Sequence, residues 1–243
     1  MRPDTWGMFA DPAILRFFGQ GLLETLSLSI VSVALSFVAA LIFALGRLSP
    51  RWWLRLPAIF YIETIRALPV LLLIFYFGIK GASLFRPIFG PEFELSRYWA
   101  GVIGLSLYTS AVLAEIIRAG IVSLPRGQSE ASRALGLSHV QSMRHVILPQ
   151  ALRLMVPAMM AQLTTVIKDT SLVGTIGVFE LLRQGRVIFT QFFNPIEVFA
   201  FVSVIYFVIC FVLSQLSRRL ELGRVTPEAA ARLAKVELRD QAA

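Results

Sequence analysis

Charged residues, cysteine and histidine are all scarce in this sequence. Only 16% of its 243 residues are charged, whereas soluble domains carry about a quarter. The single cysteine, Cys210, lies inside an apolar run, so it can form neither a disulfide framework nor a cysteine-based metal cluster. His139 and His145 are six residues apart, a spacing that a helix does not place on one metal-facing side. We therefore expect no metal site.

The residue sets that carry out hydrolysis or bind nucleotides are also missing. No carboxylate pair, Ser-His-Asp set or Cys-His set stands out in the sequence. There is no Gly-x-x-x-x-Gly-Lys-Ser/Thr loop, the motif whose backbone amides cradle nucleotide phosphates. The chain is therefore expected to bind no cofactor itself and not to be an enzyme. An intramembrane enzyme, for which the catalytic residues are missing, is only a weak alternative.

Apolar residues, by contrast, make up 56% of the chain. A core of soluble-protein size cannot absorb that much apolar surface, so most of it should face lipid. Lys and Arg number 23 against 15 Asp and Glu, a net charge of +8. These basic residues cluster between apolar runs, where the positive-inside rule of membrane proteins explains them. A lipid bilayer is thus the expected partner, and nucleic acid is not.

Five runs are long and apolar enough for spanning helices, which need about 20 residues. They are Thr25–Gly46, Leu56–Ile79, Tyr98–Ala114, Leu148–Ile167 and Val198–Ser217. No removable signal peptide is expected, because the first run is long enough to stay in the membrane. Its small residues Ser32, Ser36 and Ala40 repeat every fourth position, which predicts close helix packing. The predicted fold is all-helical, with five transmembrane helices.

The positive-inside rule also predicts the orientation. With the N-terminus outside, the inner connections hold fourteen basic residues and the outer ones seven. Residues 1–20 are then an extracytoplasmic segment and residues 219–243 a cytoplasmic tail. Residues 176–190 mix apolar and charged side chains, which predicts a short helix at the outer surface.

The polar stretch 119–149 is the longest cytoplasmic connection in this arrangement, and it is too short to fold alone. A short helix is predicted over Ser129–Leu135, ended by Gly136. Ser138 with Gln141 three residues later forms a capping box that starts a second helix. On that helix Val140, Met143 and Ile147 are expected to share one face. The result is a compact knob beneath the membrane.

The spacing of this stretch resembles the coupling loop of permeases from ATP-binding-cassette (ABC) importers. The matching positions are Glu130, Ala131, Ser132, Gly136, Val146, Leu148 and Pro149. Ser132 replaces the usual second alanine and Val146 the usual isoleucine, and both changes are small. The resemblance implies the type I permease arrangement over residues 21–218.

Other segments resemble the polar amino-acid branch of these permeases, and most closely glutamate/aspartate permeases. The segments are Gly21–Leu26, Ile62–Pro69, Ala114–Gly120 and Lys168–Leu172. In the second of them Ala67 and Leu68 stand where the family has Gly-Thr. The resemblance therefore implies a bacterial inner-membrane subunit that carries polar L-amino acids, with glutamate and aspartate as first choice.

The same resemblance implies several partners. A dimer of ABC ATPase subunits, which uses ATP and Mg, would grip the loop. A second permease subunit, identical or homologous, would complete the pathway, and an extracytoplasmic amino-acid-binding protein would deliver substrate. The alternatives are a permease for glutamine or basic amino acids and, in another class, an ATP-independent channel or carrier.

Charged residues close to the spans are candidates for gating or for ion pairs, because charge is costly in a membrane. Glu63 with Arg66, and Glu115 with Arg118, stand three residues apart, so each pair shares a helical face. Helix-stabilising ion pairs are the first interpretation and a cytoplasmic gate the second. Lys168 and Asp169 lie near the outer end of their span, where they would close an outer gate, meet substrate or form a local salt bridge.

Overall fold

Every regular element in the described part of the chain, residues 6–222 of a computed structural model, is helical. The elements are η1 (Gly7–Ala10), α1 (Pro12–Leu48), α2 (Trp52–Ala67), α3 (Val70–Phe89), α4 (Arg97–Val122), α5 (Arg126–Ala134), α6 (His139–Ser142), η2 (Met143–Ile147), α7 (Leu148–Val173), η3 (Gly174–Ile176), α8 (Leu181–Phe192) and α9 (Pro195–Leu222). The charged tail predicted from residue 219 lies outside the described residues after Leu222.

Five of these helices are long and apolar enough to cross a membrane, which confirms the predicted fold class. They are α1, α3, α4, the continuous helix His139–Ile176, and α9. The first is much longer than its apolar run, because it already begins at Pro12. The Asp11 carboxylate accepts the Ala13 amide at 2.8 Å, and proline suits the first helical position. Residues 12–20 of the predicted segment 1–20 are therefore part of α1.

The predicted span Leu56–Ile79 was wrong, because the helix breaks inside it. The short helix α2 ends at Ala67, and α3 begins at Val70. Leu68 between them is extended, with φ −90° and ψ 140°, since proline disfavours the helical conformation in the residue before it. The apolar run of the sequence hides this break, and the spanning helix is α3.

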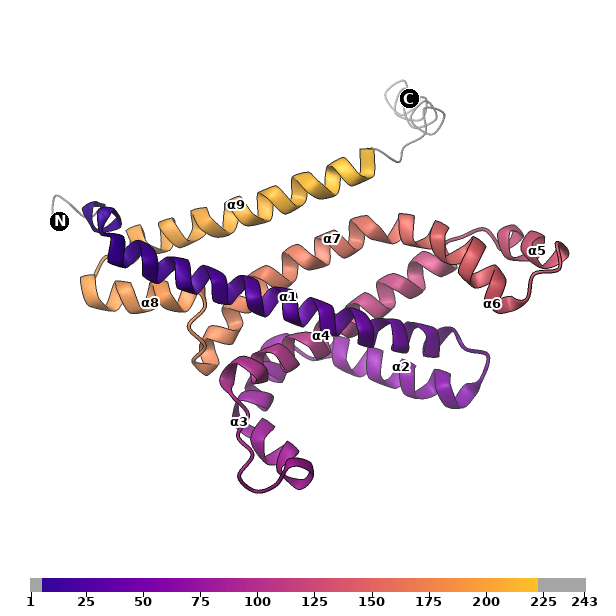
Figure 1. Cartoon of the computed structure of the whole chain (residues 1–243), viewed down its shortest axis with the longest axis horizontal. Coiled ribbons are helices and arrows are strands. Elements are labelled where there is room, and N and C mark those ends of the chain that lie inside the picture. Colours follow the sequence, from indigo (N-terminus) through magenta and orange to yellow (C-terminus); the bar gives the residue numbers. More distant parts are fainter. Residues whose placement is uncertain (1–5, 223–243) are drawn as a thin grey trace, which may run out of the picture.

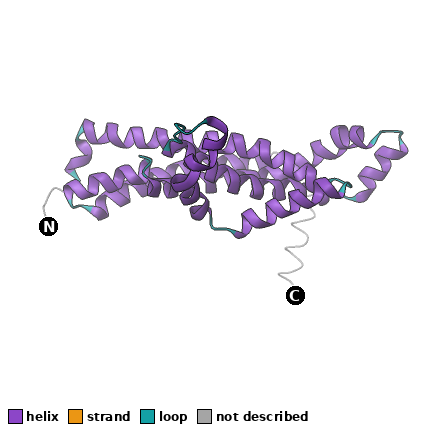
Figure 2. Ribbon diagram, turned by 90° about the horizontal axis from the view of Figure 1, so that it is seen from below, coloured by secondary structure: helices purple, strands orange, loops and turns teal. Residues whose placement is uncertain are grey.

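The long helices lie side by side along one axis of the molecule (Figures 1 and 2). The turn between α1 and α2 lies at the same end as α5 and α6, here called the loop end. The start of α1 and α8 lie at the opposite end, and α3 projects sideways from the bundle (Figure 1). Two of the basic connections counted above as inner, the one between α1 and α2 and the one between α4 and α7, thus lie at the same end.

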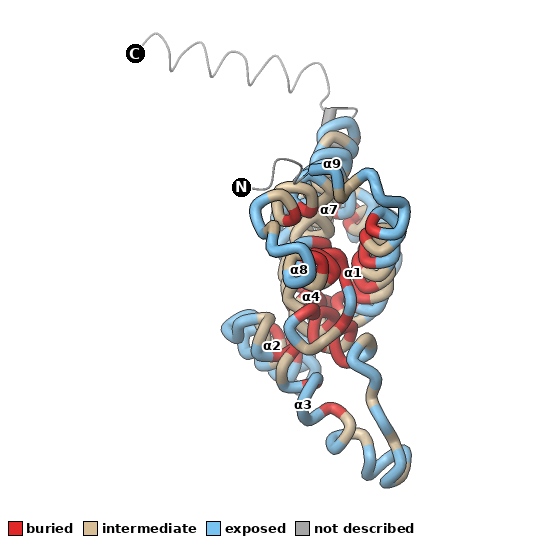
Figure 3. Tube along the Cα trace, turned by 90° about the vertical axis from the view of Figure 1, so that its left-hand side faces the viewer, coloured by how far each residue is buried: buried red, intermediate tan, exposed pale blue. Residues whose placement is uncertain are grey.

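The centre of the bundle is the contact between α1 and α4, where the buried residues gather (Figure 3). Ser32, Ser36 and Ala40 are fully buried. The Ser36 hydroxyl donates to the Ser106 carbonyl at 3.2 Å, and the Ser106 hydroxyl donates to the Ser32 carbonyl at 3.3 Å. The predicted small-residue packing is confirmed, because only small side chains allow backbones to approach this closely.

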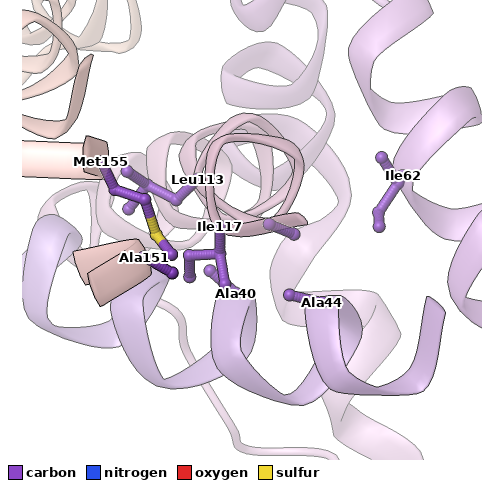
Figure 4. Close-up of a cluster of buried hydrophobic side chains, with 8 residues drawn as sticks. Ala40, Ala44, Ile62, Leu113, Ile117, Ala151 and Met155 are labelled. Carbon is purple, nitrogen blue, oxygen red and sulfur yellow. The ribbon is translucent and has the colours of Figure 1, made fainter. Parts of the chain in front are cut away.

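Toward the loop end, a cluster of buried side chains joins four helices (Figure 4). Its members are Ala40 and Ala44 of α1, Ile62 of α2, Leu113, Ala114 and Ile117 of α4, and Ala151 and Met155 of α7. A second cluster, around Phe18 and Leu181, joins α1 to α8 and α9 at the other end. The bundle is therefore packed at both ends.

The close approach of α3 to α4 yields a stability prediction. A Cβ on Gly104 would lie 2.9 Å from the Cα of Ile74, and this backbone atom cannot rotate away. We expect Gly104→Ala to lower stability by about 1–3 kcal/mol, as overpacking does. Gly19→Ala is the control, because nothing lies within 4 Å of its new Cβ. The thermal unfolding midpoint in detergent measures both, and equal midpoints for the two variants would contradict this packing.

Candidate functional site

The predicted knob is present at the loop end, and its turn has the predicted geometry. Helix α5 begins at Arg126, three residues before the predicted start, directly after Pro125. Gly136 ends it with φ +85°, a left-handed conformation that glycine adopts without strain. The Gly136 amide donates to the Arg133 carbonyl at 2.9 Å, and the Leu137 amide donates to the Ser132 carbonyl at 3.2 Å. These bonds satisfy carbonyls that a helix end leaves unpaired.

The predicted capping box at Ser138 is also present. The Ser138 hydroxyl accepts the Gln141 amide at 3.3 Å, and the Gln141 side chain accepts the Ser138 amide at 2.9 Å. The helix that starts here does not stop before the next span. It passes through a π-helical turn, Met143–Ile147, into α7. Pro149 has no backbone N–H to donate to the preceding turn, as a regular helix requires. A π turn accommodates this missing hydrogen bond.

Ser132 holds the two halves of the knob together. Its hydroxyl and that of Ser142 are hydrogen-bonded, and both residues are buried. The Ser132 hydroxyl also donates to the Ser129 carbonyl at 2.9 Å. The serine at this position, where alanine is usual, therefore supplies a bond between α5 and α6.

The exposed surface of the knob carries two large apolar side chains. Leu135 is 83% exposed and Val140 is 72% exposed. Glu130 and Ala131 are exposed as well, whereas Val146 and Leu148 are half-buried. The predicted common face of Val140, Met143 and Ile147 was wrong, because Ile147 is buried against the body of the protein. The π turn changes the register of the helix between these residues.

A cluster of charges lies where α1, α2 and α4 meet, about two turns before α4 ends. The predicted pair Glu115–Arg118 is confirmed, with Nη2 of Arg118 2.6 Å from Oε1 of Glu115. The predicted pair Glu63–Arg66 was wrong. Glu63 instead contacts Arg47, with Nη1 to Oε1 at 2.8 Å, because α2 folds back along α1 and brings the two together.

Arg47 is the residue that sequence reasoning missed in this cluster. Its Nη1 atom also lies 3.2 Å from Oε2 of Glu115, so one guanidinium contacts carboxylates on two other helices. The available signal was its position at the charged end of the first apolar run. Its partners are 16 and 68 residues away in the sequence, beyond the reach of any local pattern.

Lys168 and Asp169 lie near the other end of α7. Among the described residues, no salt bridge joins the two side chains. Lys168 is exposed and lines a pocket of about 390 Å³. The pocket lies between α7, α8 and α9 and is lined by Lys168, Ser171, Leu182, Phe199, Val202, Ser203, Tyr206, Phe207 and Cys210. It combines apolar walls with a cation and hydroxyl groups, as small-molecule sites do.

Glu180, beside this pocket, is a buried carboxylate that the sequence did not single out. It caps α8 by accepting the Leu182 amide at 2.8 Å and the Arg183 amide at 2.7 Å. The Tyr206 hydroxyl donates to it at 3.2 Å, which fixes one wall of the pocket. Burial raises the pKa of Glu180, although the amide bonds act in the opposite direction.

The short helix predicted over residues 176–190 is present as α8, with one face packed on the bundle. Leu181, Gln184 and Ile188 are buried against its neighbours, and a Cβ on Gly21 of α1 would meet the Gln184 side chain at 2.7 Å. The mixed sequence thus provides one face packed on α1 and α9 and one exposed face with Arg186 and Thr190.

The described residues thus form five apolar spans, with the knob between the third and the fourth. Residues 19–224 match the model of the binding-protein-dependent transport system inner membrane component family. The chain belongs to this family. It is accordingly a multi-pass inner-membrane protein, and it is called the permease below.

Named relatives cover most of the permease. It is 36% identical over 217 residues to the octopine transport system permease protein OccM of Rhizobium radiobacter, which covers 87% of this chain and 89% of that protein. It is also 36% identical over 204 residues to the glutamine transport system permease protein GlnP of Escherichia coli (strain K12), which covers 83% of this chain and 90% of the relative.

Two solved structures have the same fold. An amino acid ABC transporter crystallised with histidines is 32% identical, with a TM-score of 0.80, and the match covers 91% of this chain and 99% of that one. The MetNI methionine ABC transporter in an inward-facing conformation is 22% identical, with a TM-score of 0.69 over 86% of this chain and 99% of that one. The second likeness concerns the fold alone.

The turn at Gly136 yields a prediction for the knob. Gly136→Ala forces a Cβ into the left-handed region, at a cost of about 1 kcal/mol or more. We expect roughly fivefold faster amide hydrogen exchange over residues 126–142, because local opening becomes easier. Gly127→Ala is the control, since nothing lies within 4 Å of its new Cβ and its φ is not positive. Unchanged exchange in Gly136→Ala would contradict the turn described here.

Proposed function

We propose that this permease is the translocation subunit of an ABC importer for polar L-amino acids, and that residues Glu130–Pro149 dock into its ATPase. The observation that carries the docking is the shape of the knob. Two hydrogen-bonded turns hold the knob in one shape, and the side chains of Leu135 and Val140 on it are exposed. Exposed apolar side chains on a rigid support are typical of protein interfaces.

The energy for transport would come from the partner. The sequence has no phosphate-binding loop, so ATP and Mg would be bound and used by the ATPase dimer. Family membership in binding-protein-dependent systems supports a soluble binding protein that delivers the substrate. It also favours an importer over an ATP-independent channel or carrier.

A second permease subunit, identical or homologous, would complete the pathway. The support comes from α3, which stands away from the bundle (Figure 1) with Leu72, Tyr76, Ile79 and Ile88 exposed. A second subunit would cover part of this surface and leave the remainder to lipid.

The substrate pocket of this proposal is the one lined by Lys168. An exposed ammonium group beside hydroxyl groups suits the carboxylates of an amino acid, which supports glutamate and aspartate as first choice. Glutamine is the second candidate, because several relatives are named as glutamine permeases. Asp169 does not line this pocket and would take part in an outer gate, and the charges at the loop end (Glu63, Arg66, Glu115 and Arg118) would form the inner gate.

The docking proposal is tested on the permease purified with its ATPase in lipid vesicles. Wild-type ATP hydrolysis should rise when loaded binding protein is added. Leu135→Asp should weaken ATPase association by about 2 kcal/mol, or roughly 30-fold, as loss of an interface hot spot does. Thr190→Asp, which adds the same charge at the opposite end, serves as the control. Hydrolysis that never responds to binding protein would favour a channel or carrier.

The substrate proposal is tested by uptake with a panel of amino acids. Lys168→Ala should reduce uptake about tenfold or more, because a charge-assisted hydrogen bond to the carboxylate is lost. Arg16→Ala, which removes an equal charge from an exposed position of α1, should leave uptake unchanged. Normal uptake by Lys168→Ala would remove this residue from the substrate site. The competing amino acid that blocks uptake best distinguishes acidic substrates from glutamine.

A further inference from the structure

Arg47 is placed to connect three helices at the loop end. It comes from the last turn of α1, and its side chain is only 18% exposed. One nitrogen, Nη1, lies 2.8 Å from Glu63 of α2 and 3.2 Å from Glu115 of α4. The Glu115–Arg118 pair, by contrast, stays within α4. The Arg47 contacts therefore hold different helices together.

Neighbouring contacts reinforce the attachment of α2. Phe43 of α1 stacks on Tyr61 of α2, with centroids 3.8 Å apart and an interplanar angle of 11°. The Tyr61 hydroxyl is 2.7 Å from the Ser110 hydroxyl of α4. A Cβ on Gly46 would lie 3.2 Å from the Cβ of Ala58, so α1 and α2 are in close contact here. Helix α2 is thus packed on both α1 and α4.

The same region leads directly into the knob. From Glu115, α4 continues for about two turns to Val122, and α5 begins at Arg126. At its other end, α2 is separated from α3 by the extended residue Leu68 and by Pro69. Helix α2 is therefore packed firmly on the end of α4 from Glu115 to Val122, here called the stem of the knob. Its connection to the spanning helix α3 is only the two-residue break.

We propose that Arg47 is a positioning residue that makes the α1–α2 hairpin move as one body with the stem of the coupling loop. Movement of the knob then reaches the start of α3, and the break at Leu68–Pro69 absorbs the change in angle. Removal of the guanidinium leaves the exposed Glu63 without a salt-bridge partner among the described residues, and leaves the half-buried Glu115 paired only with Arg118 of its own helix. The α1–α2 hairpin is then no longer forced to move together with the stem. This inference rests on the proposed docking of the loop to an ATPase.

The test compares three variants in the complex of permease, ATPase and binding protein in vesicles. Arg47→Gln removes the charge. Arg47→Lys keeps it, and because both contacts come from one nitrogen, an ammonium can replace them. Arg55→Gln, on the exposed side of α2, removes an equal charge without an ion pair among the described residues. The readout is the number of amino acids transported per ATP hydrolysed.

Arg47→Gln should lower this ratio at least about fivefold, a typical allosteric coupling, while hydrolysis and ATPase association persist. Arg47→Lys should keep most of the ratio, and Arg55→Gln all of it. A merely structural role would lower hydrolysis and transport together and leave the ratio unchanged, which overturns the proposal. So does an equal ratio in Arg47→Gln and Arg55→Gln.

A charge exchange keeps the inference testable if Arg47→Gln fails to assemble. The double variant Arg47→Glu with Glu63→Arg retains opposite charges between α1 and α2. It should recover transport per ATP in part relative to Arg47→Glu alone, because the exchange restores the contact between α1 and α2 but not the contact to Glu115, and no recovery overturns the proposal. Wild-type complex without stimulated hydrolysis would instead refute the docking proposal, so the two failures are distinguishable.

Discussion

The contact between α1 and α4 is the constraint on which the other helices depend. In a bilayer, lipid tails are as apolar as the side chains, so burial alone does not hold helices together. The two helices instead approach through small residues, and the hydroxyls of Ser36 and Ser106 donate to carbonyls of the opposite helix. Helices α2, α7 and α8 each pack against this pair. A larger side chain at Ser32 or Ser36 would therefore disturb the whole bundle.

Local patterns were sufficient to predict the knob. The glycine turn at Gly136 and the capping box at Ser138 each depend on residues within three or four positions, and both are present. The register beyond them was not predicted, because the π turn before Pro149 has no periodic signal. The break before α3 had a local signal in Pro69, but the surrounding apolar run outweighed it.

Contacts between distant segments were largely beyond the sequence. Arg47 pairs with Glu63 and Glu115 only because α2 folds back along α1 and both lie on α4. The buried Glu180 is hidden for the same reason, since its environment comes from the Tyr206 hydroxyl on α9 and the packing of α8. Residue types and spacing identified the charged positions. They did not identify which charges meet.

The uninterrupted path from the knob into α7 has a mechanical consequence. From His139 to Ile176 the chain is one 38-residue helix, about 57 Å long at 1.5 Å per residue. Lys168 lies near the end of this helix that is far from the knob. The path from the knob to the pocket therefore contains two bending points, the π turn Met143–Ile147 and Pro157, and movement of the knob reaches Lys168 only to the extent that both stay stiff.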